Sequence, residues 1–585
     1  RALSGGDGIG PSPAAAIRKI AELAGGAFRP AIPIQIGIGI DQVALGGNTV
    51  ANLRGDISTG AGGWNLDRFE FRAPGYTQVR LSGHLAVGKD AVSFAGPAEV
   101  DAGDPKVLVA WLEGRADVAQ SDLRPLRLRG DLTLASDRFA ADRLSAAFDG
   151  KTVTGHLAYA FASGGRAAKL DAALNAAELD IDAALSFGNA LIAGSAIERP
   201  HDMTIAIDIA RASIAGFIAR NASARLKIDA GGLQIDKLSV SDLGGAAFSA
   251  SGRIVTAAPS PQGSMRVDLD APDMTPVMAL LARFAPQTAQ TLRRGAAAMA
   301  PAKLHAQLTI DGAAPAVAKL AIDGNLGKVR VALSGQANTD AIAFTAGDLK
   351  LDGKLEADDG KTLLAMLDLD RVLVVDTGPG TLTLKANGPA RGDLKIDGRL
   401  TAGGLDAGAS GSAKLFTDAP SAALRLTILR ADAGPLRGGA RAPLPVTFAG
   451  NVALTAKEVT LSDINATIAG ATLRGKLGLT LPAPRRVHGE IETDTLDAPS
   501  LVKAAIGMPS AANSGAGWTW SGEPFAGGVL GDYGGQIMLK ARRADLLPRL
   551  MAREFRATLH FGKNELSVDD VSGDVAGGRF AGKLS

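Results

Sequence analysis

The sequence predicts a mainly β fold: an elongated, repetitive, twisted antiparallel sheet that is rolled into an open groove, with a few short helices. Three observations predict it. A nineteen-residue pattern recurs without gaps at 139–157, 459–477 and 566–584; apolar and polar residues alternate over most of the chain; and Gly recurs on the apolar side of that alternation. Because successive side chains of a strand point to opposite faces of a sheet, this alternation gives the sheet one apolar and one polar face.

The composition supports repetition rather than one compact core. A chain of 585 residues is too long for a single core, whereas repeated units can each pack on their neighbours. Lys plus Arg (62) nearly balance Asp plus Glu (60), so the basic stripe of a nucleic-acid-binding surface is not evident and no nucleic acid is expected as a partner. There is no Cys, which excludes disulfides, thiolate metal sites and Cys nucleophiles.

Each nineteen-residue repeat reads as strand, turn, strand. Apolar or small residues hold positions 1, 3, 6, 8, 10, 15 and 19, and Gly holds positions 12 and 17. The alternation loses its parity between positions 3 and 6, where Asp569 and Asp570 stand in the last repeat, and such a break predicts a bulge or a corner. Asp149-Gly150 predicts a tight hairpin turn.

A shorter unit, apolar-x-Gly-x-apolar, occurs well beyond the full repeats, for example at 351–355 and 396–400. Gly weakens a strand and marks sharp coiling or the close approach of another group, so we expect the apolar face to be concave. The repeats then predict which residues line the groove: Val153, Gly155, Leu157, Leu473, Gly475, Leu477, Phe580, Gly582 and Leu584.

Helices are expected at few places. Ser12 and Pro13 predict a helix start, and the tetrapeptide LDAP, at 269–272 and 496–499, is followed each time by a helical pattern such as Leu280, Leu281 and Phe284. These signals divide the chain in order. We expect an N-terminal segment with a short helix (1–60), a first β-repeat section (61–272), a helical insertion (273–300), a second β-repeat section (301–495), and a short helix followed by a terminal β-repeat section (496–585).

Several motifs resemble chemical sites and are better explained by structure. Residues 374–378 contain Asp376-Thr377-Gly378, as aspartic proteases do, but the sequence has no second D-[ST]-G motif to supply the paired carboxylate. Gly470 to Lys476 begins like a phosphate-binding loop, yet a strand residue follows where Ser or Thr should hold magnesium. The six His do not have metal-ligand spacing. We therefore expect no catalytic residues, no metal site, no cofactor and no enzymatic activity.

These patterns resemble the AsmA-like family of bacterial envelope proteins. The resemblance rests on residues 62–85, the three repeats, the LDAP-plus-helix units and the ending at 565–584. It implies a groove with an apolar interior and a periplasmic protein that an N-terminal helix, expected outside this sequence, anchors in the inner membrane. It also implies phospholipid transport between inner and outer membrane and a role in outer-membrane integrity. Phospholipids, the two membranes and membrane proteins are the implied partners.

Aliphatic side chains with Gly gaps on one face could cover acyl chains without directional contacts, which suits a lipid conduit. Two other functions stay open. An assembly factor could offer its sheet edges to nascent outer-membrane strands. A β-solenoid adhesin, polysaccharide enzyme or structural protein could pack the same apolar face on itself and leave no groove.

Overall fold

The computed structural model describes most of the chain. The described residues are 12–13, 15–16, 33–60, 63–87, 92–115, 123–194, 198–256, 260–286, 289–290, 293–312, 316–339, 347–370, 372–415, 417, 419–434, 443–481, 485–499, 533–547, 550–562 and 565–584. The chain divides into two compact units. Unit 1 comprises Arg1–Ala258, Gly263–Ala271 and Thr275–Ala285, and unit 2 comprises Pro259–Gln262, Pro272–Met274 and Pro286–Ser585.

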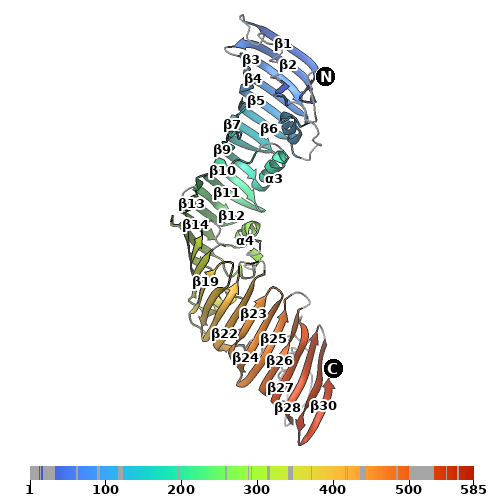
Figure 1. Cartoon of the computed structure of the whole chain (residues 1–585), viewed down its shortest axis with the longest axis vertical. Helices are drawn as coiled ribbons and strands as arrows, with labels where there is room; N and C mark the ends of the chain where they lie inside the picture. Colours follow the sequence, from blue (N-terminus) through green and yellow to red (C-terminus); the bar gives the residue numbers. More distant parts are fainter. Residues whose placement is uncertain are drawn as a thin grey trace, which may run out of the picture. The chain divides into compact units, whose positions relative to one another are not determined.

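Unit 1 is a sheet of strands that follow one another in chain order (Figure 1). Its strands are β1 (Gln35–Leu45), β2 (Asn48–Gly60), β3 (Gly63–Ala73), β4 (Thr77–Val87), β5 (Val92–Ala102), β6 (Leu126–Leu134), β7 (Arg138–Phe148), β8 (Lys151–Ala160), β9 (Lys169–Asp180), β10 (Asp202–Ile214), β11 (Phe217–Asp229), β12 (Gly232–Leu243), β13 (Ala246–Val255) and β14 (Gln262–Ala271). Its helices are α2 (Pro105–Leu112), α3 (Ile181–Ile192) and α4 (Thr275–Phe284).

Unit 2 repeats this architecture. Its strands are β15 (Ala302–Ile310), β16 (Ala316–Leu326), β17 (Val329–Thr339), β18 (Asp348–Ala357), β19 (Gly380–Pro389), β20 (Leu394–Ala402), β21 (Leu405–Lys414), β22 (Ser421–Asp432), β23 (Pro445–Thr455), β24 (Glu458–Ile468), β25 (Ala471–Thr480), β26 (Arg486–Asp497), β27 (Gly534–Leu547), β28 (Leu550–Gly562), β29 (Glu565–Val575) and β30 (Gly578–Leu584). It also holds helix α6 (Gly360–Met366) and the 3-10 turn η2 (Arg293–Gly295).

Among the strand pairings that the structure describes, neighbours run antiparallel, except for one parallel pair in each unit. In unit 1, β9 pairs parallel with β10, and α3 lies between them in the chain. In unit 2, β26 pairs parallel with β27. A parallel pair requires the chain to return from one edge of the sheet to the other before the next strand begins. Because β9 and β10 run in the same direction, the alternation of the strands shifts by one at this pair. As a result, β5, β9 and β14 all end at the same edge of unit 1.

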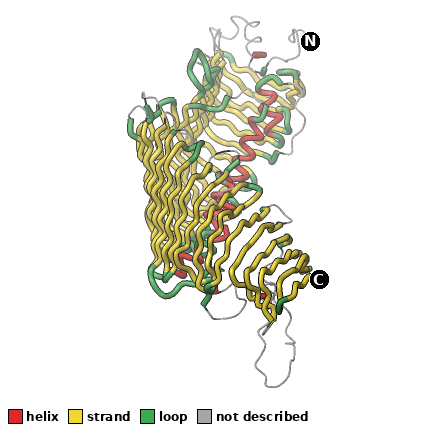
Figure 2. Tube along the Cα trace, turned by 60° about the horizontal axis from the view of Figure 1, so that its bottom comes forward, coloured by secondary structure: helices red, strands yellow, loops and turns green. Residues whose placement is uncertain are grey.

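We call the edge at which these strands end the helix edge, because α2, α3 and α4 each follow there; in unit 2, β18 and α6 define it in the same way. Within each unit, Figure 2 shows the helices along one side of that unit's strands. Three of them begin at an Asp whose carboxylate accepts backbone N–H groups of the first turn: Asp104, Asp180 and Asp359. Such caps stabilise a helix start by about 1 kcal/mol.

The predicted parity break is a bulge in all three repeats. Pairing shifts between Ala141 and Leu144, between Leu461 and Ile464, and between Val568 and Val571. The residues in the bulges that adopt positive φ are Arg143 (50°), Asp463 (52°) and Asp570 (53°). Each bulge lets the strand bend while its apolar side chains stay on one face. This prediction is confirmed.

The fold class is confirmed as well. The described residues are mainly strand, arranged as an open antiparallel sheet with few short helices. The helical pattern after the first LDAP is α4, which ends at Phe284. The pattern after the second LDAP lies outside the described residues beyond Pro499, as does most of the helix expected after Pro13. The structure adds α2, α3 and α6, which the sequence did not predict.

Candidate functional site: an apolar trough

The concave face of unit 2 is apolar from its first strand to its last. Cross-strand pairing joins one inward residue of every strand into a line across the sheet, which we call the central row. Its members are Leu308, Leu320, Gly335, Leu351, Ala386, Ile396, Gly411, Leu424, Val452, Leu461, Leu477, Gly489, Ile537, Leu559, Val568 and Leu584. Each member is aliphatic or Gly, so the row contains no charge and no hydroxyl.

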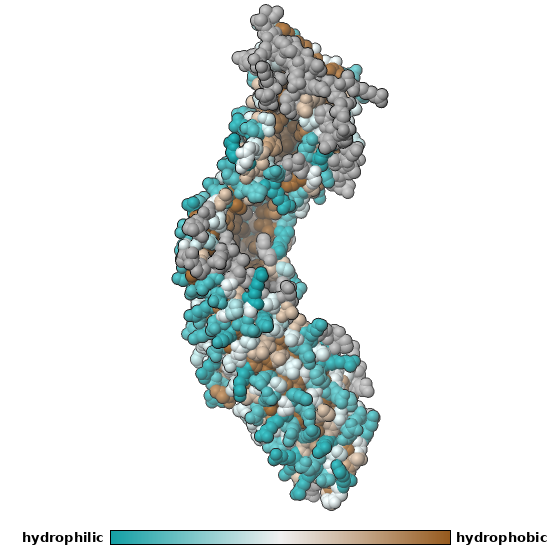
Figure 3. Space-filling view, in the orientation of Figure 1, coloured by the Kyte–Doolittle hydropathy of each residue, from teal (hydrophilic) through white to brown (hydrophobic). Residues whose placement is uncertain are grey.

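Unit 1 has a central row of the same kind. It comprises Ile36, Ile57, Leu66, Gly83, Gly96, Leu132, Ala141, Leu157, Ala172, Ile205, Leu226, Ile235 and Gly252. Figure 3 shows a hollow in this unit whose interior is hydrophobic and whose rim carries hydrophilic residues. The two rows are described separately, each within its own unit.

The best-defined stretch of trough runs over β16–β20 in unit 2. At the helix edge, Leu363 and Met366 of α6 pack with buried Val329 and Ala357. At the opposite edge, Leu394 packs with Ala337, Leu349 and Ala390. Between these two buried clusters, Leu384 in the middle of β19 remains 45% exposed. A face that is covered at both edges and accessible along its middle is a trough.

Three glycines form the floor of this stretch. An added Cβ on Gly335 would lie 3.0 Å from Cδ2 of Leu351, one on Gly353 would lie 3.4 Å from Cδ1 of Leu333, and one on Gly398 would lie 3.6 Å from Cδ1 of Leu384. Leucine side chains of neighbouring strands therefore flank each Gly. The floor alternates between Leu side chains and Gly gaps, which gives a corrugated aliphatic surface without directional contacts.

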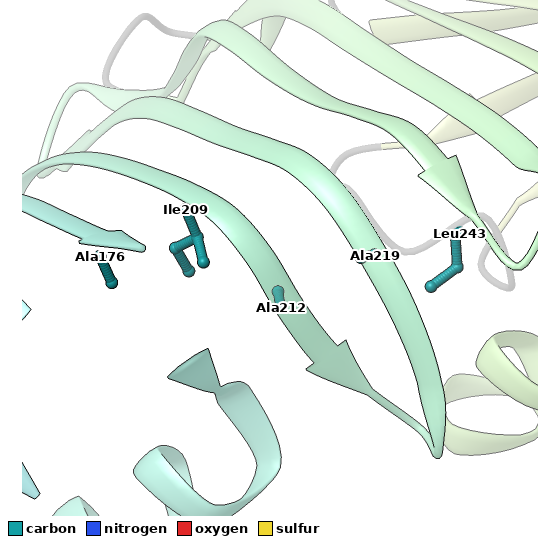
Figure 4. Close-up of a cluster of buried hydrophobic side chains, with 5 residues drawn as sticks. All are labelled: Ala176, Ile209, Ala212, Ala219 and Leu243. Carbon is teal, nitrogen blue, oxygen red and sulfur yellow. The ribbon is translucent and has the colours of Figure 1, made fainter. Parts of the chain in front are cut away.

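Helices cover the trough along the helix edge of unit 1. Figure 4 shows Ala176, Ile209, Ala212, Ala219 and Leu243, all buried, on the side of the strands that faces the helices. Ile181 of α3 and Leu280 of α4 pack against this cluster. Asp182 of α3 links this helix to the turn between β10 and β11 and to α4. Its carboxylate accepts from the backbone N–H of Ala215 (2.8 Å) and from Nη1 of Arg283 in α4 (2.5 Å).

The structure distributes the predicted lining residues over different parts of the concave side. Leu157, Leu477 and Leu584 belong to the central rows, although only the backbone of Leu584 is described. Val153 packs against the buried cluster beneath α3, at the covered edge. Leu473 pairs with Ala466 and Thr493, on the helix-edge side of Leu477.

The other four lining predictions concern the C-terminal strand and the glycines. Phe580 packs against the buried cluster that contains Phe555. Gly582 is exposed in β30. Gly155 and Gly475 serve strand packing: an added Cβ would lie 1.9 Å from the carbonyl oxygen of Ala173 or 2.0 Å from that of Glu490. At these two positions Gly permits close strand approach and leaves no open gap.

The convex face carries the charges, in cross-strand pairs. Arg129 donates to Glu99 at 2.6 Å and Arg225 donates to Asp208 at 2.5 Å. The hydrogen bond from Arg129 holds the pKa of the Glu99 carboxyl below its usual value, and the one from Arg225 does the same for Asp208. These carboxylates therefore stay ionised at neutral pH. One face of the sheet is mainly apolar, and the other is ionic and wet.

The residues whose sequence motifs resembled catalytic or metal-binding sites make contacts that are typical of structural residues. Asp376 has an exposed side chain, and its backbone N–H donates to the carbonyl oxygen of Gly403 at 2.7 Å. His84 lies 3.2 Å from Oδ1 of Asn65, and His156 lies 2.6 Å from Oδ1 of Asp142. Within the described ranges, no group of three or more His, Asp or Glu side chains is placed to hold a metal ion.

Sequence reasoning missed two features of the site. It did not find the exposed Leu384, whose accessibility depends on what covers the ends of its strand rather than on the strand itself. It also missed α2, α3 and α6, although Asp104-Pro105 and Asp359-Gly360 follow strands as the LDAP units do and could have indicated helix starts. Among the described residues no helix has the length and apolar character to cross a membrane.

Comparison with known proteins gives no assignment: no family model, no curated protein and no solved structure matches the chain.

Proposed function

We propose that this protein is a non-enzymatic carrier of phospholipids between the inner and outer membranes of a bacterial envelope, working in the periplasm through the apolar trough. Acyl chains lie along the central rows, and polar headgroups stay at the open side in water. The resemblance to the AsmA-like family suggests this function, and the central row of unit 2 carries the argument. It crosses every strand from β15 to β30 without a polar side chain.

Physical chemistry favours sliding over tight binding in such a trough. Removing an acyl chain from water is favourable by about 0.8 kcal/mol per buried CH₂, and this gain is nearly the same at every point of a uniform aliphatic surface. A lipid that advances by one strand therefore exchanges equivalent contacts. A packed core does not account for Leu384, which is accessible although it lies between two buried clusters.

The central test compares two variants of β22. One places a carboxylate on the apolar face of the strand, and the other places a carboxylate on its opposite face. Leu424 belongs to the central row, while the adjacent Ala423 is exposed and lies opposite Ser412 and Ala453, with no charged cross-strand neighbour. We expect Leu424→Glu to reduce the lipid that co-purifies with the protein, as measured by mass spectrometry, because a carboxylate brings water into the trough. Ala423→Glu should leave the lipid content unchanged.

Leu477→Glu repeats the test at a second point of the central row, again with Ala423→Glu as the control on the convex face, because Lys476 lies opposite Glu490 and a carboxylate there would add repulsion. Circular dichroism separates the outcomes. In a packed core, a buried and unpaired carboxylate would cost about 3–5 kcal/mol and unfold the region. A folded Leu424→Glu protein that keeps its full lipid content would contradict the proposal.

Cross-linking locates the lipid directly. A photoactivatable residue at Leu384 should form adducts with lipid, whereas the same residue at Lys385, which is exposed on the opposite face, should not. Equal labelling at the two positions would mean that lipid binds the surface without using the trough.

A further inference from the structure

Three rows of inward-facing residues lie between the two buried clusters on β17–β20. The row nearest α6, which we call the helix row, comprises Val331, Leu355, Leu382 and Leu400. The next row, which we call the Leu384 row, comprises Leu333, Gly353, Leu384 and Gly398. The third is the part of the central row that contains Leu351 and Ile396. The Leu384 row therefore has one row on either side.

Buried residues limit the width of this stretch to these three rows. On the helix side, three leucines of the helix row pack against Ala357 and Leu363, which are 2% and 0% exposed. On the opposite side, Leu351 and Ile396 of the central row pack against Leu394, which is 0% exposed. The two outer rows thus form the walls of the trough, and the Leu384 row runs along its accessible middle.

The three rows form two furrows that run across the strands, one on either side of the Leu384 row. Residues on one face are two positions apart along a strand, so neighbouring rows are about 7 Å apart. Carbon atoms of packed chains contact one another at about 3.5–4.0 Å, so one acyl chain fits between two rows and a second does not. Each furrow therefore has the width of one acyl chain.

We infer that the two acyl chains of one phospholipid lie side by side in these furrows, and that lipids pass this stretch in single file. The inference rests on the proposed function and adds to it a limit on the number of acyl chains. A lipid with one or two chains removes all of them from water. Lipid A carries more chains than the two furrows hold, even when chains extend from its headgroup in both directions along the trough. Part of its hydrocarbon would stay in water, which is unfavourable.

Gly353 of the Leu384 row allows one furrow to be filled and the other left open. An added Cβ there meets its nearest neighbour, Cδ1 of Leu333, at 3.4 Å, so a larger side chain has room to enter the trough. A single Phe ring at this position can lean into only one furrow. We expect Gly353→Phe to weaken the binding of phosphatidylethanolamine at least about tenfold, because one acyl chain loses its contacts. Lysophosphatidylethanolamine, whose single chain needs one furrow, should bind nearly as tightly as it binds the unchanged protein.

The experiment is an equilibrium titration of the full chain with each lipid, labelled by a fluorophore on its headgroup. The matched control is Gly408→Phe, because Gly408 lies on the convex face opposite Arg399 and Thr427. An added Cβ there meets its nearest neighbour at 3.7 Å, and the variant should bind both lipids as the unchanged protein does. Circular dichroism checks the fold of each variant.

A second measurement needs no variant and therefore does not depend on how Gly353→Phe folds. The unchanged protein should bind lipid A at least about tenfold more weakly than phosphatidylethanolamine, because chains outside the furrows stay in water. The inference is overturned if lipid A binds as tightly as phosphatidylethanolamine. It is also overturned if a folded Gly353→Phe protein loses both lipids equally or neither. Failure of the proposed function would look different, since the unchanged protein would then bind neither phosphatidylethanolamine nor its single-chain form.

Discussion

Two kinds of glycine occupy this sheet, and they differ in what they tolerate. Gly475 has φ of 146°, and an added Cβ would lie 2.0 Å from the carbonyl oxygen of Glu490. Gly353 has an ordinary strand conformation, and its nearest neighbour to an added Cβ is a Leu333 methyl group at 3.4 Å. The first kind fixes strand spacing, and the second shapes the floor of the trough.

Alanine substitution should separate the two kinds. We expect Gly475→Ala to destabilise the protein by at least about 1–3 kcal/mol, through backbone strain and the clash with Glu490. Gly353→Ala should be neutral or slightly stabilising, because Ala restricts the unfolded chain more than Gly does. Chemical denaturation of the two variants measures both values. Equal destabilisation would show that the conformational distinction has no energetic consequence.

The variant Asp376→Ala tests the expectation that this protein has no aspartic-protease activity. The contribution of Asp376 to the fold is a backbone hydrogen bond to Gly403, which substitution of the side chain leaves in place. Asp376→Ala should therefore preserve stability, lipid content and any envelope phenotype in a complementation assay. Loss of function in a folded Asp376→Ala protein would revive the aspartic-protease interpretation, with the second carboxylate supplied by another copy of the chain.

At the scale of elements, each helix holds one group of strands closed along the helix edge. In unit 1, Trp111 of α2 is 4% exposed, packs with Val50, Ala73 and Val79, and donates from Nε1 to the carbonyl oxygen of Leu45 at 2.9 Å. One side chain thus connects a helix that follows β5 to the end of β1. Helix α2 therefore holds the first strands together at the helix edge.

Removing the Trp111 side chain should destabilise these strands alone. Trp111→Ala should cost about 3–5 kcal/mol, while Leu112→Ala, at a position that is 50% exposed, should have little effect. Hydrogen exchange should show lost protection in β1–β5 and unchanged protection in unit 2, because each strand contacts mainly its neighbours. Simultaneous loss of protection in both units would contradict this modular picture.

The sequence predicted the strands better than it predicted what covers them. The alternation and the bulges are local properties: a parity break such as that at Asp569 and Asp570 can be read from a few residues. Helices α2 and α6 were missed because they are 8 and 7 residues long, and their apolar runs, such as VLVAWL, resemble strands. The parallel pair of β9 and β10 could not be predicted, since a strand has the same alternation whichever way its neighbour runs.

On the scale of the whole molecule, the two faces of the sheet make different contributions. The central rows depend on register: a shift by one residue would place Lys476 where Leu477 stands and interrupt the apolar path. Charged cross-strand pairs on the convex face oppose such a shift, because a slipped strand would lose its ionic partners. The ionic face therefore helps to keep the apolar face continuous, although no single exposed pair contributes much stability.

This division of roles predicts how stability depends on pH and salt. Glu99, Asp208 and Glu490 all have pKa values lowered by hydrogen bonds, from Arg129, Arg225 and Lys540 respectively. Because their pKa values are lower in the folded state, the unfolded state binds protons first as pH falls. Their stabilising contribution is complete above the ordinary carboxyl values of 4.5 for Glu and 3.8 for Asp, and it is lost progressively below them.

The melting temperature should therefore be nearly constant from about pH 7 to about pH 5 and then fall steeply towards about pH 2, since many such pairs titrate together. In about 1 M salt, where charges are screened beyond about 3 Å, the melting temperature at neutral pH should be lower and its fall with acid shallower. Lipid content should follow the same curve, because loss of register interrupts the trough. A melting temperature that is insensitive to both acid and salt would mean that aliphatic packing alone sets the register, and that the ordered ionic face serves only to keep the convex side wet.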